Sequence, residues 1–201
     1  MHIELHLPLP PMKGCTLPVL TISSTRKTKG KEASSNGTLL HELIEVFLNS
    51  GGKKTFQNAT LHREFGQFSE WYERVAVLKG WTPYRTELSM VFKDDKNNAL
   101  LAGQLDALFT DECGRYILVD WKRISSKKSI TDDAKIWRMG NSHITRNVPD
   151  RDFDRYSLQL AIYAMMLRQI GIEVGTERYI VRMHEDMQGD VVSALVDMLC
   201  F

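Results

Sequence analysis

The stretch ALLAGQLDALFTDECGRYILVDWKR, residues Ala99–Arg123, decides the fold. It contains two segments, Ala99–Thr110 and Arg115–Trp121, whose apolar residues shift toward the period of two that is typical of β-strands. Between them lies Asp111–Gly114, a short segment of turn-forming residues. The stretch therefore predicts a β-hairpin whose second strand ends in Asp120-Trp121-Lys122.

The segments on either side predict further strands and helices. Two more strands are expected at Tyr84–Phe92 and Glu177–Met183. Apolar residues at helical spacing predict three helices: one that begins at Thr38 and ends at Gly51, one over Leu61–Leu78 and one over Arg155–Ile170. These elements together predict an α/β fold with a mixed β-sheet flanked by helices.

The length of 201 residues fits one domain. Residues 1–36 are rich in Pro, Ser, Thr and Lys, and we expect an N-terminal arm and polar loop there, followed by a single domain over residues 37–201. The segment Val191–Phe201 is apolar to its last residue, which suggests a domain cut from a longer protein. Residues 125–154 are polar and irregular and mix basic with aromatic side chains. Such a segment suits gripping a nucleic-acid strand, and a plain surface loop is an equally good interpretation.

Composition sets few limits on function. The net charge of +1 arises from 26 Lys+Arg against 25 Asp+Glu, whereas a protein that coats DNA is usually far more basic; this balance is compatible with a nuclease, because a carboxylate-rich metal site lowers the net charge. Three scattered cysteines, Cys15, Cys113 and Cys200, favour a reducing compartment over a disulfide framework. No apolar run reaches the ~20 residues of a membrane span, and no secretory signal is recognisable. We expect an intracellular protein that makes no membrane contact, in the cytoplasm or nucleus rather than the mitochondrion.

The hairpin carries the residues that point to chemistry. With a tight turn at Asp111–Gly114, Asp106 lies within a residue of Asp120 on the neighbouring strand, and Lys122 shares the face of Asp120. Two carboxylates this close repel each other unless a positive charge lies between them, and Mg²⁺ or Mn²⁺ prefers such oxygen ligands. Lys122 can orient or deprotonate an attacking water, or stabilise charge on a phosphate. The alternative is a surface hairpin on which Lys122 pairs with one carboxylate.

Two helices add candidate site residues. His41 lies beside the apolar stripe of the first helix, where its imidazole can be a further metal ligand, although a single helical histidine is more often structural. Gln159 and Tyr163 lie four residues apart and share one face of the last helix. An amide within an apolar face needs a specific partner, either in a catalytic site or within the core.

Four short motifs occur in a fixed order: G-x-x-x-H ending at His41, G-x-x-D ending at Asp106, D-x-K at Asp120–Lys122, and Q-x-x-x-Y at Gln159–Tyr163. Over roughly residues 37–183 the chain thereby resembles the RecB-like exonuclease branch of the PD-(D/E)xK nuclease superfamily. This resemblance implies a restriction-endonuclease-like sheet and a divalent-metal-dependent deoxyribonuclease.

The resemblance also implies residue roles. The metal ligands would be His41, Asp106, Asp120, the carbonyl of Trp121 and, through a metal-bound water, Glu87. In the catalytic centre, Lys122 acts beside Asp106 and Asp120. Gln159 and Tyr163 position the substrate phosphate or steady the lysine. The expected cofactor is Mg²⁺ or Mn²⁺, without an iron–sulfur cluster, because some members need four cysteines for one and this chain has three at unsuitable positions.

The implied substrate is DNA, cleaved without sequence preference from single strands or free ends, with a helicase or polymerase on the same or a partner chain. One alternative is an RNA endonuclease of the cap-snatching type, although such sites usually carry Pro-Asp where this chain has Leu105-Asp106. Another is an inactive nucleic-acid-binding module, against which the presence of Asp106, Asp120 and Lys122 together argues.

Overall fold

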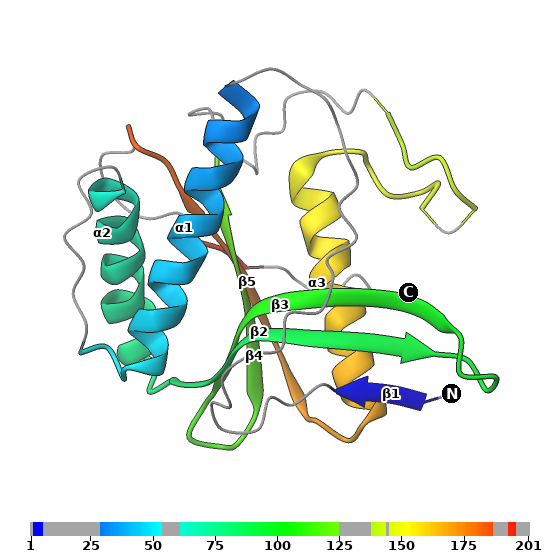
Figure 1. The fold of residues 1–201 in the computed structure, drawn as a ribbon. Coiled ribbons are helices and arrows are strands. Elements are labelled where there is room, and N and C mark those ends of the chain that lie inside the picture. The colour runs from blue at the N-terminus through cyan, green and yellow to red at the C-terminus, as the bar shows by residue number, and fades with distance from the viewer. Residues whose placement is uncertain are drawn as a thin grey trace.

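A computed structural model of the chain describes residues 2–5, 29–53, 61–124, 138–143, 145–186 and 193–195. In these residues a six-stranded sheet, ordered β1-β2-β3-β4-β5-β6, lies between helices (Figure 1). The strands are β1 (His2–Leu5), β2 (Thr82–Lys93), β3 (Ala99–Thr110), β4 (Tyr116–Arg123), β5 (Val174–Met183) and β6 (Ser193–Leu195). The helices are α1 (Lys29–Asn49), α2 (His62–Trp71), which continues as a π-helical segment (Tyr72–Val77), and α3 (Asp152–Gln169). The predicted α/β fold with a mixed sheet and flanking helices is confirmed.

The sheet is mixed because one pair of neighbours, β4 and β5, is parallel whereas the other pairs are antiparallel. A parallel pair requires a crossover connection, and α3 lies in this connection. The predicted hairpin is the β3–β4 pair, in the register Ala107↔Val119. Asp111 shapes its turn, since Oδ1 accepts hydrogen bonds from the amides of Cys113 and Arg115, each 2.9 Å long.

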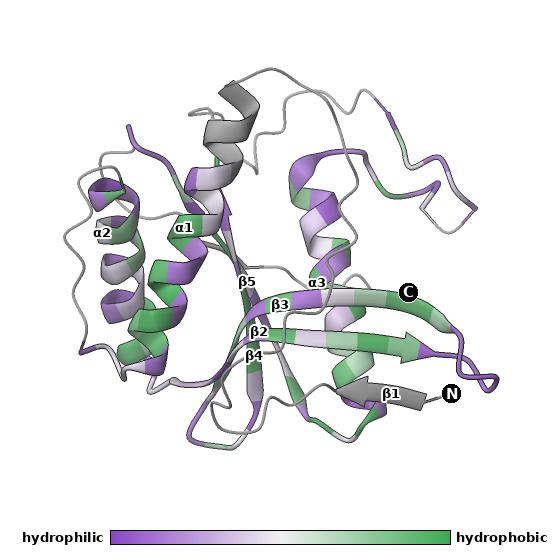
Figure 2. Ribbon diagram, in the orientation of Figure 1, coloured by the Kyte–Doolittle hydropathy of each residue, from purple (hydrophilic) through white to green (hydrophobic). Residues whose placement is uncertain are grey.

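Helices cover both faces of the sheet (Figures 1 and 2), with α1 and α2 on one face and α3 on the other. An aromatic cluster fills the first interface, where Trp121 packs edge-on against Phe68 and Trp71. Leucines and other aliphatic side chains dominate the second interface, including Leu105 and Leu160. Because both faces are covered, β4 is buried over five consecutive residues rather than at alternate ones.

Strands β2 and β3 change direction at Glu87 and Asp106. Glu87 has a φ of 48°, in the left-handed region that a residue within a strand rarely adopts. Leu105 packs in the α3-side core whereas Ala107 packs in the α1-side core, although residues two apart normally share one face of a strand. The β3–β4 pairing ends at Ala107, while β3 remains paired with β2 as far as Ala99. The β2–β3 pair thus bends away from β4 next to Asp106. Figure 1 shows β2 and β3 as a long curved pair.

Some boundaries differ from the expectation. Helix α1 begins at Lys29, inside the segment expected to be arm and loop, and its first residues include Lys, Glu and Ala, which favour helices. Most of the expected arm lies outside the described residues, as do residues 125–137 and 144 of the segment 125–154. Among the described helices, none combines the length and the apolar character needed to cross a membrane.

Candidate active site

Three side chains from three elements meet at the bend in the sheet. His41 from α1 places Nδ1 3.5 Å from Oδ1 of Asp106 on β3 and 3.9 Å from Oε1 of Glu87 on β2. One ligand atom from each residue lies within 4.8 Å of the other two. The left-handed conformation of Glu87 therefore coincides with its place in this cluster, as backbone strain often does at functional sites.

The second oxygen of Asp106 faces the backbone. Oδ2 accepts a hydrogen bond of 2.7 Å from the amide of Trp121, a buried contact one step beyond the last β3–β4 ladder pair. The bond fixes the carboxylate, so that Oδ1 faces His41. The indole ring of Trp121 is buried on the α1 and α2 side, and the role of its carbonyl as a ligand stays a prediction.

Asp120 and Lys122 form an ion pair beside the cluster, with 2.6 Å between Oδ2 and Nζ. The Asp120 side chain is only 2% exposed, whereas that of Lys122 is 21% exposed. Burial and repulsion from Asp106 raise the pKa of Asp120 to about 6, although Lys122 and His41 oppose the rise. The fully buried carboxylate therefore depends on nearby positive charge to remain ionised.

The cluster also attracts positive charge strongly. Burial alone would lower the pKa of His41, but Asp106 and Glu87 together raise it to about 10. Burial likewise tends to lower the pKa of Lys122, and the carboxylates of Asp120 and Asp106 outweigh it, so the net shift is upward. Without a bound cation, both side chains are thus positively charged at neutral pH and stand where a cation would be stabilised.

A further carboxylate lies close by on α1. Burial and then repulsion from Glu87 and Glu42 raise the pKa of Glu45, which is half-buried one helical turn after His41. Glu45 was not among the predicted site residues, although its spacing of four residues from His41 places both on one face of the helix.

The donor set suits a divalent cation. His41, Glu87 and Asp106 offer one nitrogen and carboxylate oxygens, the ligands that Mn²⁺ accepts, and Mg²⁺ takes the oxygens. These three residues would hold the ion. Asp120, expected as a direct ligand, lies outside this group of three and pairs with Lys122, so its role as a ligand stays a prediction.

Gln159 and Tyr163 lie together on α3, where Gln159 Nε2 donates a hydrogen bond of 2.9 Å to Tyr163 Oη. They line a pocket of about 270 Å³ together with Leu101 and Ala102 of β3 and other residues of α3. Within the described residues, the contact from α3 to the lysine comes instead from Tyr156, whose ring lies 4.5 Å from Lys122 Nζ. Tyr156 was not among the predicted site residues, because its contact with Lys122 depends on how α3 packs against β4.

No protein-family model matches the sequence, and no curated protein matches it. Among solved structures, the chain is similar to a candidate exonuclease from Eubacterium rectale, with a TM-score of 0.48 and 12% identity, over 87% of this chain and 61% of that chain. It is also similar to SSO0001, with a TM-score of 0.34 and 13% identity, over 81% of this chain and 79% of that chain. The chain thus spans less than two thirds of the exonuclease chain. These similarities do not assign the chain to a family.

Proposed function

We propose that the chain is a divalent-metal-dependent nuclease that hydrolyses phosphodiester bonds. One observation carries the proposal: the His41–Glu87–Asp106 cluster lies beside the buried Asp120–Lys122 ion pair at a bend in a mixed sheet. Carboxylates that require a cation, next to an ammonium group, suit a substrate whose reacting group is a phosphate anion.

Each side chain has a distinct role in this proposal. The bound ion would supply Lewis acidity and lower the pKa of a water. Lys122, held as an ammonium by Asp120, stabilises negative charge on the phosphate oxygens. Asp106 is held by a hydrogen bond from the Trp121 amide, so its carboxylate needs to move little when substrate binds. Gln159 and Tyr163 present an amide and a phenol further along α3, where they can position a neighbouring phosphate.

The proposed substrate is DNA, bound as a single strand or at a free end and cleaved without sequence preference. The support for this choice is the resemblance of the four ordered motifs to RecB-like exonucleases. Contacts to the backbone would also make binding weaken steeply with added salt.

The experiment compares labelled single- and double-stranded DNA and RNA, linear and circular, with Mg²⁺ or Mn²⁺. We expect cleavage of linear DNA that is lost in Lys122→Ala, whereas Lys96→Ala, a change in the exposed β2–β3 turn, cleaves like the wild type. Equal cleavage of circular and linear strands would indicate an endonuclease. RNA as the sole substrate would favour the cap-snatching alternative, and metal binding without cleavage would favour the inactive module.

A further inference from the structure

The ammonium of Lys122 lies beside a carboxylate and an aromatic ring. The carboxylate is that of Asp120, and the ring is that of Tyr156, with 4.5 Å between Nζ and the ring centroid. This distance is within the range of a cation–π interaction, which is stronger where water is partly excluded. Since the Lys122 side chain is only 21% exposed, the ring shields the ammonium from solvent as well as attracting it.

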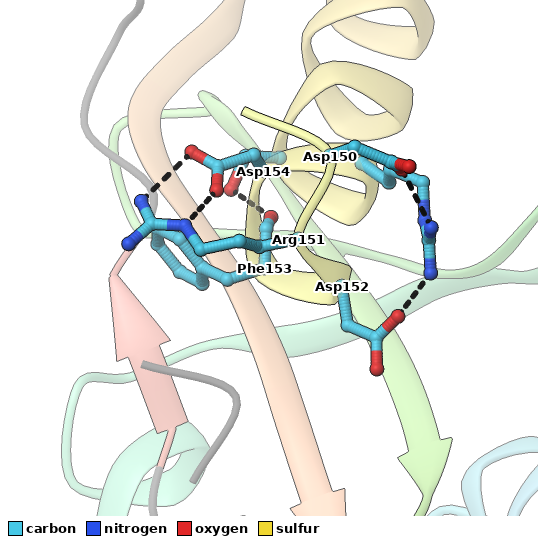
Figure 3. A network of polar contacts seen from close by, with 7 residues as sticks. Asp150, Arg151, Asp152, Phe153 and Asp154 are labelled. Atoms are coloured by element: carbon cyan, nitrogen blue, oxygen red, sulfur yellow. Dashed lines mark hydrogen bonds and ion pairs between the residues drawn. The ribbon is translucent and has the colours of Figure 1, made fainter. Parts of the chain in front are cut away.

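Tyr156 lies near the start of α3, where charged side chains pair with one another. Arg155 forms ion pairs with both Asp150 and Asp152, at 2.8 Å to the first, and Arg151 Nε lies 2.5 Å from Asp154 Oδ2 (Figure 3). Acidic residues in a first helical turn also interact favourably with the helix dipole. These charge pairs link the residues just before Tyr156 in the first turn of α3.

A ring and a carboxylate hold the lysine differently. The Asp120 carboxylate is also a candidate metal ligand, so its hold on Lys122 changes when its oxygens are shared with a cation. The face of a phenol ring offers no such ligand atom and attracts the ammonium in either case. The ring therefore keeps the lysine at the site independently of Asp120.

We infer that Tyr156 is a positioning residue: its ring holds the Lys122 ammonium at the cluster for catalysis. This inference rests on the proposed nuclease function. It predicts that removal of the ring lowers kcat whereas removal of the hydroxyl alone does not. It also predicts that KM changes little.

The kinetic test uses Tyr156→Leu, which removes the ring, and Tyr156→Phe, which keeps it. Tyr156→Leu should lower kcat roughly 2- to 30-fold, the range of a cation–π interaction, with little change in KM. Tyr156→Phe should remain within about twofold of the wild type. The matched control is Tyr84→Leu, because Tyr84 is 54% exposed and packs on Tyr116 at the other end of β4. Unchanged kcat in Tyr156→Leu, or an equal loss in Tyr156→Phe, would overturn the inference.

A second measurement does not require activity. In metal-free protein labelled with ¹³C at the lysine ε-carbon, the ε-proton resonance of Lys122, assigned with Lys122→Arg, should be shifted upfield by the ring. The shift should persist in Tyr156→Phe and disappear in Tyr156→Leu, with circular dichroism showing that each variant is folded. A resonance that is unshifted in the wild type would overturn the inference even if the protein is a nuclease. A shifted resonance in a protein that cleaves nothing would refute the nuclease proposal and leave the contact established.

Discussion

The phenol ring of Tyr163 occupies the space in which a side chain of residue 103 would lie. A β-carbon added at Gly103 would collide with the hydroxyl and two ring carbons of Tyr163. The glycine of the G-x-x-D motif and the tyrosine of the Q-x-x-x-Y motif are therefore complementary in shape, which joins β3 to α3 three residues from Asp106.

Gly103→Ala should displace Tyr163 and weaken its hydrogen bond with Gln159. Overpacking of this kind costs about 1–3 kcal/mol of unfolding free energy, or roughly 2–4 °C in Tm per kcal/mol for a chain of this size. Thermal unfolding measures it. The control is Gly66→Ala in α2, where an added β-carbon meets nothing within 4 Å, so this variant should be as stable as the wild type or more so. If the two alanines have equal effects, the ring does not occupy that space in solution.

Metal affinity should depend on pH over an unusually high range. A cation can be bound only by neutral imidazole, and an ordinary histidine would be neutral above about 6.5. Because the pKa of His41 is raised to about 10, a proton competes with the cation throughout the range from 7 to 10. Mn²⁺ affinity, measured by calorimetry, should rise with pH up to the onset of metal hydrolysis. In His41→Asn the rise should be much flatter, and a wild-type affinity that is constant above pH 7 would contradict the raised pKa.

The same shift links stability to pH in metal-free protein. A histidine whose folded-state pKa is raised stabilises the fold fully below its unfolded pKa, near 6.5, and this contribution is lost as pH rises toward about 10. Urea unfolding in the presence of a chelator should therefore show a decline in stability from pH 7 to 9 that is smaller in His41→Asn.

Asp120 should oppose folding in the absence of metal. Its pKa is raised to about 6, so its ionised form destabilises the folded state increasingly as pH rises above the unfolded value. Asp120→Asn should increase the unfolding free energy by about 1–2 kcal/mol at pH 8 and have little effect at pH 4, while weakening metal binding and cleavage. Asp111→Asn is the contrasting control, since hydrogen bonds with Arg115 lower the pKa of Asp111 and its loss should destabilise the protein at pH 8. A destabilised Asp120→Asn variant at pH 8 would refute this account.

Glu87 and Glu45 should differ in their effect on metal binding. Glu87 belongs to the cluster of potential ligands, whereas Glu45 adds negative charge nearby. Glu87→Gln should weaken Mn²⁺ binding by at least about tenfold, as expected for loss of a ligand, and Glu45→Gln by only about two- to threefold. Equal losses would show that charge alone, and not coordination, determines the affinity.

The sequence predicted strands β2 to β5 and the three helices because their periodicity is local, but it did not predict the short strands β1, which lies in the expected arm, and β6. It also predicted that Asp106 and Asp120 would be near neighbours, since a short turn sets the register of a hairpin. It did not predict the left-handed conformation of Glu87, which depends on how the β2–β3 pair bends away from β4. The contact of Tyr156 with Lys122 was equally inaccessible, because it depends on the packing of a helix against a strand about thirty residues away in sequence.

The hydrogen bond from the Trp121 amide to Asp106 has a consequence for how variants of this carboxylate are interpreted. Asp106 Oδ2 accepts the Trp121 amide at the position where the next β3–β4 backbone hydrogen bond would otherwise be. The carboxylate of the proposed reactive centre therefore also holds strands β3 and β4 together. Loss of cleavage in Asp106→Ala would have two causes, the loss of a metal ligand and weaker pairing of β3 with β4. Asp106→Asn retains an oxygen that can accept a hydrogen bond from the Trp121 amide, so this variant separates the effect on coordination from the effect on strand pairing. Conversely, a cation that immobilises Asp106 should slow hydrogen exchange of the Trp121 amide, which makes one backbone proton a reporter of occupancy.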